Sequence, residues 1–363
     1  MGLHPRDVAA PFALAAILAG CAPLEGASGR PSALDAPSGT PASTPVAASP
    51  GRVDPSPSVA GNSPFEVVEF DVPAGSHPHD VAPAADGGVW YTGQLAGTLG
   101  HLDPATGTVR EVPLGAGSAP HGVIMGPDGA PWITDGGLNA IVRVDPATDK
   151  VTTHPLPASH PAANLNTAAF DGAGTLWFTG QAGTLGRLNP STGVVEAFDA
   201  PRGSGPYGID AAPDGEVWLA SLAGSYLGRI DRATGGVEVI EPPTPGAGVR
   251  RVWADPQGRL WVSEWNAGQL GRYDPADGSW REWPLPGPRR PQAYAVYVDD
   301  EGIPWVTDFG NNAIVRFDPA TEQLTQIPVP SDEAAVRQLL GRDGEVWGAE
   351  SATDKLILIR TGA

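Results

Sequence analysis

The chain has 363 residues and a formal net charge of −19 at pH 7, from 22 basic and 41 acidic side chains. This charge opposes binding to nucleic acid or to an anionic lipid surface, because both are themselves negative. Cys21 is the single cysteine, which excludes an intrachain disulfide and leaves the fold to rest on its packed core. The length suffices for one large domain.

Residues 1–20 have the pattern of an export signal. Arg6 lies near the start, and residues 8–18 form an apolar run that is too short to span a membrane. Leu-Ala-Gly before Cys21 resembles a bacterial lipobox, in which the chain is cleaved before a cysteine that carries lipid. We therefore expect an exported lipoprotein, held by lipid at the periplasmic or extracellular face of the bacterial cell envelope. The alternative is an ordinary signal peptide with an incidental cysteine.

Residues 21–64 are rich in Pro, Ser, Ala and Gly and contain no aromatic residue. Such a segment cannot bury enough apolar surface to fold, so we predict a disordered tether. Proline-rich chains extend by about 3.1 Å per residue, which gives a reach on the order of 100 Å.

Residues 65–363 contain one sequence unit repeated seven times. The period of 41 to 45 residues is carried by short apolar runs and not by helical stripes. This pattern is typical of a β-propeller with four antiparallel strands per blade, with six or eight blades as alternatives to seven. The repeat is marked by Trp90, Trp132, Trp177, Trp218, Trp261, Trp305 and Trp347.

The second copy shows the four strands most clearly. Pro-Asp-Gly at residues 127–129 predicts the turn after the first strand, and Asp-Pro-Ala-Thr at 145–148 predicts a type I turn after the third. The predicted strands are residues 122–125, 131–134, 140–144 and 151–156.

The two ends of the repeat region predict how the ring closes. The last copy has three predicted strands, at residues 338–340, 345–349 and 355–359, and no fourth. Residues 65–73, FEVVEFDVP, have the pattern of a fourth strand placed before the first copy. Pairing this strand with the last copy would remove an open sheet edge. The sequence therefore predicts an all-β, seven-bladed propeller whose last blade is closed by the N-terminal strand.

Two columns of variable residues meet at one end of the predicted channel, because the start of a blade's first strand lies beside the end of its antiparallel second strand. Structural positions repeat one residue type, whereas these columns vary, so we predict that they form the ligand-binding face. The first column contains His79, His121, Asn166, Tyr207, Arg250 and Tyr294. The second contains Asp135, Glu264, Asp308 and Glu350, and Arg337 lies beside them.

The motif Pro-His-Gly-Val at residues 120–123, followed by Pro-Asp-Gly and by Trp-Ile-Thr-Asp at 132–135, resembles the streptogramin lyase (virginiamycin B lyase) family. The resemblance covers residues 65–363. It implies a seven-bladed propeller that linearises cyclic depsipeptide antibiotics by elimination, with a Mg²⁺ ion. It also implies histidines opening the first strands of two adjacent blades, and two carboxylates on the second of these blades. One histidine would act as general base on a carbon acid that the metal polarises.

The resemblance places this site on the last two blades, where the present chain departs from the pattern. Tyr294 and Val336 occupy the histidine positions. Glu350 matches the carboxylate that ends the second strand, but Ala334 stands where the other metal ligand is expected.

A rotated version of the site is conceivable on the first two blades. His79 and His121 are 42 residues apart, and Asp135 follows His121 by fourteen, as the resemblance requires. Ala119 replaces the second carboxylate, although Mg²⁺ usually needs one or two carboxylates and several waters. One hypothesis thus has His79 and His121 as base and partner, with Asp135 holding Mg²⁺. The alternatives are hydrogen-bonded histidines at the channel mouth, or ligand contact without catalysis.

Two functions remain open. The first is a Mg²⁺-dependent carbon–oxygen lyase that acts on a cyclic depsipeptide or a related ester. The second is a non-catalytic, lipid-tethered propeller that binds a peptide, glycan or envelope protein through its channel face. In both cases we expect a monomer with a small-molecule or peptide ligand at the channel mouth. We expect no nucleic-acid partner, and membrane contact only through the lipid.

Overall fold

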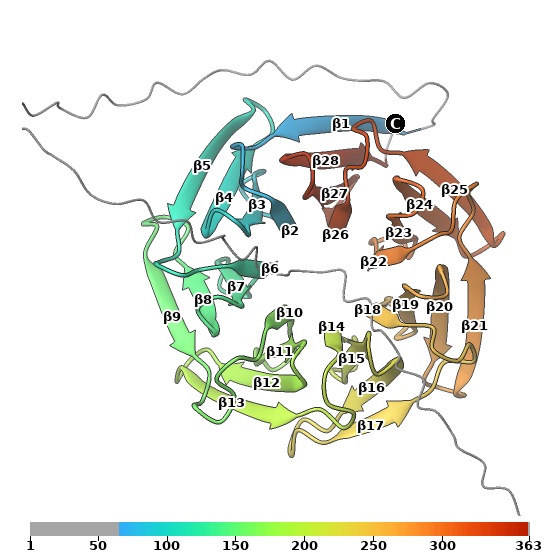
Figure 1. Ribbon diagram of the computed structural model, residues 1–363, viewed down its shortest axis with the longest axis horizontal. Coiled ribbons are helices and arrows are strands. Elements are labelled where there is room, and N and C mark those ends of the chain that lie inside the picture. Colours follow the sequence, from blue (N-terminus) through green and yellow to red (C-terminus); the bar gives the residue numbers. More distant parts are fainter. Residues whose placement is uncertain (1–64, 362–363) are drawn as a thin grey trace, which may run out of the picture. The chain divides into compact units, whose positions relative to one another are not determined.

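The computed structural model describes residues 65–361, and all of its regular structure there is β-strand (Figure 1). The predicted signal segment, Cys21 and the tether lie outside the described residues. No helix in residues 65–361 is long and apolar enough to cross a membrane.

Seven four-stranded antiparallel sheets surround a central channel, which confirms the predicted architecture (Figure 1). The innermost strands are β2 (Pro78–Pro83), β6 (Pro120–Met125), β10 (Leu165–Phe170), β14 (Pro206–Ala211), β18 (Val249–Ala254), β22 (Ala293–Val298) and β26 (Val336–Arg342). The second strands are β3 (Val89–Gly93), β7 (Pro131–Asp135), β11 (Leu176–Gly180), β15 (Val217–Ser221), β19 (Leu260–Glu264), β23 (Pro304–Asp308) and β27 (Glu345–Glu350). The third strands are β4 (Thr98–Asp103), β8 (Ala140–Val144), β12 (Thr184–Asn189), β16 (Tyr226–Ile230), β20 (Gln269–Asp274), β24 (Ala313–Asp318) and β28 (Lys355–Arg360). The outermost are β1 (Glu66–Asp71), β5 (Thr108–Pro113), β9 (Val151–Pro155), β13 (Val194–Asp199), β17 (Val237–Ile240), β21 (Ser279–Pro284) and β25 (Gln323–Pro328).

The N-terminal strand closes the ring as predicted. β1 pairs antiparallel with β28, from Glu66 opposite Arg360 to Asp71 opposite Lys355. Lys355 Nζ also lies 2.8 Å from Glu69 Oε2, so an ion pair accompanies the backbone ladder. The last blade therefore combines strands from the two ends of the described chain. β1 covers the edge of β28, whose backbone groups would otherwise be unpaired.

The repeated tryptophans are buried between blades, and four of them are anchored by an aspartate in the turn before them. Trp132 Nε1 donates to Asp128 Oδ1 at 3.1 Å, and Trp305 Nε1 donates to Asp299 Oδ2 at 2.8 Å. The indole nitrogen would otherwise be a buried donor without an acceptor, which costs free energy. The acidic turn residue thus explains why a turn motif and a tryptophan recur together.

Each innermost strand has a register irregularity near its start, where it pairs with the second strand. In a regular strand, neighbouring side chains point to opposite faces, whereas a bulge allows two consecutive side chains to turn the same way. His79 and Asp80 show the consequence, because their side chains hydrogen-bond to each other beside the channel. The bulge of the first blade therefore brings two consecutive side chains towards the channel.

Hydroxyl side chains of the second strands hold these bulges and join neighbouring blades. Thr134 Oγ1 accepts the Gly122 N–H at 2.9 Å and donates to the Asn166 carbonyl of the next blade. The same double contact is made by Thr92, Thr179 and Ser263. The threonine of the Trp-x-Thr repeat is thus a bridge between blades.

We expect Thr134→Val to lower the free energy of unfolding by about 1–3 kcal/mol, because valine keeps the shape but leaves a buried donor and a buried acceptor unpaired. Urea unfolding followed by tryptophan fluorescence measures the effect. Thr153→Val, on the exposed outer strand β9, is the matched control and should change stability by less than about 0.5 kcal/mol. Equal effects of the two substitutions would contradict the bridge.

Candidate functional site

The residues that open the innermost strands fill the channel at the end where we predicted the binding face. Each is 0–4% exposed. We call this layer the channel plug, and it consists of His79, His121, Asn166, Tyr207, Arg250, Tyr294 and Val336. The residue types at these positions differ from blade to blade because each side chain contacts different neighbours across the channel.

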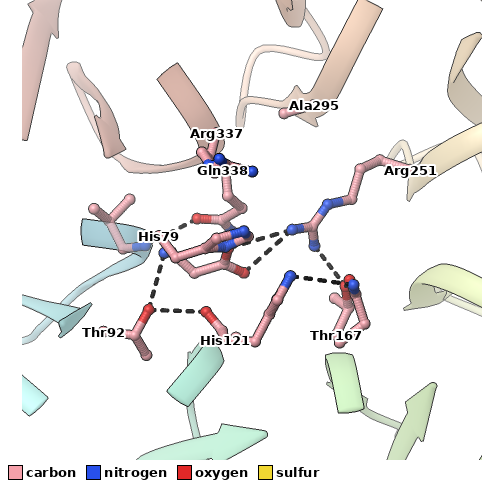
Figure 2. Close-up of polar contacts among 12 residues, drawn as sticks. His79, Thr92, His121, Thr167, Arg251, Ala295, Arg337 and Gln338 are labelled. Carbon is pink, nitrogen blue, oxygen red and sulfur yellow. Dashed lines mark hydrogen bonds and ion pairs between the residues drawn. The ribbon is translucent and has the colours of Figure 1, made fainter. Parts of the chain in front are cut away.

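The two histidines pack against each other inside the plug. Their ring centroids are 3.6 Å apart, and His79 Nδ1 lies 2.8 Å from Asp80 Oδ1 (Figure 2). Asn166 Nδ2 lies 3.1 Å from His121 Nε2. Burial lowers the pKa of both histidines well below the ordinary value. The charge of Arg337 depresses the pKa of His79 further, and His79 acts in the same direction on His121. Both imidazoles are therefore neutral at pH 7.

A buried ion pair crosses the channel beside the histidines. Arg251 Nη2 of β18 lies 3.2 Å and 3.4 Å from the two carboxylate oxygens of Asp80 of β2, and Arg251 Nη1 donates to Thr167 Oγ1 at 2.6 Å (Figure 2). Burial raises the pKa of Asp80, and the Arg251 charge opposes that shift. The pair connects the first blade to the fifth.

An aromatic and cationic group completes the plug. The Arg250 guanidinium lies 4.0 Å from the Tyr207 ring centroid and 3.7 Å from that of Tyr294. The two phenol oxygens are 2.7 Å apart, and Tyr294 OH lies 3.3 Å from both His79 Nε2 and Arg337 Nη1. The histidine pair and the tyrosine pair therefore belong to one hydrogen-bonded network.

Beyond the plug lies a cavity of about 310 Å³, which we call the channel cavity. All seven innermost strands contribute to its wall, through residues one to four positions after the plug residues. Its polar end consists of Asp80, Thr167, Arg251 and Gln338, and most of the remaining wall is apolar. Its outer end is lined by half-buried side chains such as Met125 and Phe170. The cavity thus lies towards the turns between first and second strands, at the end opposite to the predicted face.

Asp80, Thr167 and Gln338 were not predicted from the sequence as site residues. Asp80 and Thr167 follow a plug residue directly, and strict strand alternation would turn them away from the channel. The signal was present in the sequence, since the residue after each plug residue is just as variable along the repeats.

Two aspartates of the second column fasten loops. Asp135 accepts hydrogen bonds from Ser118 Oγ and from the Ala119 N–H, and Asp308 accepts from the Gln292 N–H and Asn311 Nδ2.

Among the described residues, the side chains close enough to share a metal ion are His79, Asp80 and His121, with ligand atoms within 4.8 Å of one another. The structure brings Asp80 to the histidines, while Asp135 as a metal ligand stays a prediction.

The remaining predicted ligand-binding residues also make internal contacts. Gln269 Nε2 donates to Glu264 Oε2 at 2.6 Å, and Thr353 Oγ1 donates to Glu350 Oε2 at 2.7 Å. Burial raises the pKa of each glutamic acid to about 8. Arg337 is half-buried and donates to Ser351 Oγ as well as to Tyr294. A ligand role for these residues stays a prediction.

Tyr294 should ionise before any other tyrosine. Burial alone would raise its pKa, but Arg250, Arg337 and Arg251 outweigh burial and lower it to about 8. The other five tyrosines all have raised pKa values. We expect the absorbance at 295 nm to show a one-tyrosine step near pH 8 that disappears in Tyr294→Phe and survives in Tyr273→Phe. A step that persists without Tyr294 would contradict this assignment.

Glu264 should make stability depend on pH. Its folded-state pKa of about 8 lies above the ordinary value of 4.5, so the folded protein retains a proton that the unfolded chain releases. The stabilisation is complete below pH 4.5 and is lost as pH rises through 8. The retained proton can contribute at most about 4–5 kcal/mol to the free energy of unfolding. We expect Glu264→Gln to reduce the stability loss between pH 5.5 and 8.5 in urea unfolding, and exposed Glu301→Gln to leave it unchanged. Identical pH profiles for all three proteins would exclude this role.

Comparison with known proteins agrees with this architecture. A solved structure described as streptogramin B lyase is 25% identical, with a TM-score of 0.74, and the match covers 82% of this chain and 97% of that chain. Virginiamycin B lyase from Staphylococcus aureus is 21% identical, with a TM-score of 0.75 over 82% of this chain and 100% of that chain. YCF48 bound to D1 peptide, at 17% identity and a TM-score of 0.64 over 85% and 100% of the two chains, shares the fold alone.

No curated protein matches the chain significantly. The sequence profile of the Virginiamycin B lyase family matches it twice, over residues 61–289 and 167–359. The two matches overlap, as expected for a chain built from equivalent repeats, and together they span nearly all of the described propeller. The chain belongs to the virginiamycin B lyase family.

Proposed function

We propose that this propeller binds a small amphipathic molecule in its channel cavity. The observation that carries the proposal is the cavity itself, which has a mostly apolar wall and one polar end formed by Asp80, Arg251, Thr167 and Gln338. Its volume of about 310 Å³ lies at the lower end of the range typical of small-molecule pockets. A few convergent polar groups in an apolar pocket orient a ligand, while the apolar wall supplies binding free energy.

Mg²⁺ does not fit the His79, Asp80 and His121 group in its present arrangement. The Asp80 carboxylate is already paired with Arg251, and Mg²⁺ relies on carboxylate oxygens and retained waters. Arg250 and Arg337 add positive charge next to the same group, which would repel a divalent cation. We therefore derive no catalytic step through a metal.

Elimination at the carbon–oxygen bond of a cyclic depsipeptide or related ester is the second candidate. One observation favours it besides the family relationship: His79 Nδ1 is held by Asp80, so the neutral imidazole has an unprotonated Nε2 that could act as a general base once its contact with Tyr294 OH is broken. His79 is fully buried and His121 is 4% exposed, so the plug would have to open before a substrate reached either ring. The accessible cavity is why we rank binding first.

The lipid predicted on Cys21 would hold the propeller at the bacterial cell envelope. On this proposal the channel is the small-molecule site, and the protein acts at the envelope as a monomer without a nucleic-acid partner. Metabolic labelling with a fatty acid analogue, compared with Cys21→Ser, tests the anchor.

Binding can be measured with the neutral fluorescent probe N-phenyl-1-naphthylamine and the full chain. Ala295 lines the cavity at the position equivalent to Asp80 and Arg251, so Ala295→Leu should fill space that the probe needs (Figure 2). We expect one saturable site and at least tenfold weaker binding in Ala295→Leu. Ala182→Leu, on an exposed loop, is the matched control and should bind as the unsubstituted protein does. Equal binding by both variants would overturn the proposal.

The second candidate is tested with a B-type streptogramin and mass spectrometry, with and without Mg²⁺. A linear product of unchanged mass that is lost in the His79→Ala/His121→Ala double variant would establish elimination at these histidines. We expect no such product at protein concentrations that approach the substrate concentration.

A further inference from the structure

The polar end of the channel holds more positive than negative charge. Arg250 and Arg251 are each 4% exposed, and Asp80 is the one carboxylate that accepts a hydrogen bond from either of them among residues 65–361. Among residues 65–361, Arg250 Nε, Arg251 Nε and His121 Nδ1 are buried and have no hydrogen-bond acceptor. Buried charges and donors without partners cost free energy. This end of the channel therefore favours an additional anion.

The residues around Arg251 suit an oxyanion. Arg251 and Thr167 both line the channel cavity, and Gln338 joins them there. Gln338 Oε1 accepts the Val81 N–H at 3.0 Å, which leaves the amide nitrogen of the same side chain as a donor (Figure 2). A guanidinium with neighbouring N–H donors matches two oxygens of a carboxylate better than it matches a single neutral acceptor.

The outer end of the same cavity has the opposite character. Asp210 of β14 lines both the cavity and the groove at its rim. Its Oδ2 accepts the Ala254 N–H at 2.8 Å, and among residues 65–361 no cationic side chain forms an ion pair with it. Burial raises its pKa to about 7. Trp253 and Tyr297, with ring centroids 5.0 Å apart, line the same rim. A carboxylate beside aromatic rings is suited to an ammonium group.

The strand geometry gives the spacing of the two ends. Arg251 and Ala254 lie on β18, and Ala254 is bonded to Asp210. Three residues of strand correspond to about 10 Å. The wall between these positions includes the apolar residues Ile209 and Val252.

We propose that the channel ligand is a dipolar amphipathic molecule, with an oxyanion at Arg251, an ammonium group at Asp210 and an apolar segment of about 10 Å between them. This inference rests on the proposed function, because it names the ligand class of the same cavity. An ω-amino acid or a short peptide with apolar side chains has this chemistry. The acidic rim would select against simple anions that lack the ammonium group.

Four eight-carbon compounds test the proposal: 8-aminooctanoate, octanoate, octylamine and 1-octanol. Each competes with N-phenyl-1-naphthylamine for the full chain at pH 8, where Asp210 is largely ionised. We expect 8-aminooctanoate to have a Kd at least tenfold lower than that of 1-octanol. Arg251→Met should weaken the two carboxylates at least tenfold and spare 1-octanol. Asp210→Asn should weaken the two amines and spare octanoate.

Arg251→Met leaves Asp80 without its partner, so the variant can lose stability for that reason alone. The double variant Asp80→Asn/Arg251→Met removes both charges and should show the same loss of carboxylate binding. Arg289 is exposed and lies in the loop between β21 and β22, so Arg289→Met is the matched control for removing a positive charge. Binding of the neutral probe confirms that each variant retains the cavity.

The outcomes separate the two proposals. If all four compounds bind equally and Ala295→Leu blocks them all, the dipolar class is overturned while binding in the cavity stands. If Asp210→Asn leaves 8-aminooctanoate binding unchanged, or Arg251→Met leaves octanoate binding unchanged, the dipolar class is likewise overturned. If Ala295→Leu does not weaken the neutral probe, the proposed function itself fails.

Discussion

The structure depends on a hydroxyl group that bridges adjacent blades at the bulge of the innermost strand in the first, second, third and fifth blades. Thr134 illustrates it, since one oxygen takes up the N–H that the bulge frees and also bonds the next blade's carbonyl. The bridge therefore fixes two features together, the angle between neighbouring blades and the bulged backbone of the innermost strand. Because such a bulge can turn two consecutive side chains towards the channel, as at His79 and Asp80, the propeller can line it with more polar groups than a regular strand allows.

These polar groups divide the channel into two unequal parts. At the end where the innermost strands begin, the plug satisfies most of its donors and acceptors through the histidine pair and the tyrosine pair, and the Asp80–Arg251 ion pair lies directly beside it. On the other side, the wall becomes apolar and leaves a cavity. Tyr294 contributes to this division, since its phenol hydrogen-bonds across the channel and its ring stacks on Phe309 with ring centroids 4.5 Å apart. The channel of this family member therefore has its cavity at the end formed by the turns between the first and second strands of each blade.

The candidate site was predictable in part. The column positions of His79, His121 and Tyr207 identified the residues that meet in the channel, because a repeated fold places equivalent positions at equal depth. The same reasoning predicted a ligand-binding face and did not determine whether it is open. In the structure these side chains are long enough to meet across the channel, and they are buried. Asp80 and Thr167 were missed because alternation along a strand fails at a bulge, and a bulge leaves no clear mark in the sequence.

The sequence by itself determined the number of blades, the strand order and the closing strand. These follow from local patterns, as in β8, where the predicted residues 140–144 coincide with the observed Ala140–Val144. Only the tertiary structure decided which end of the channel is filled and which is open. That outcome depends on contacts between residues far apart in the chain, such as Asp80 with Arg251 and Tyr207 with Tyr294. No local pattern encodes the distance between two side chains that meet only after seven blades close into a ring.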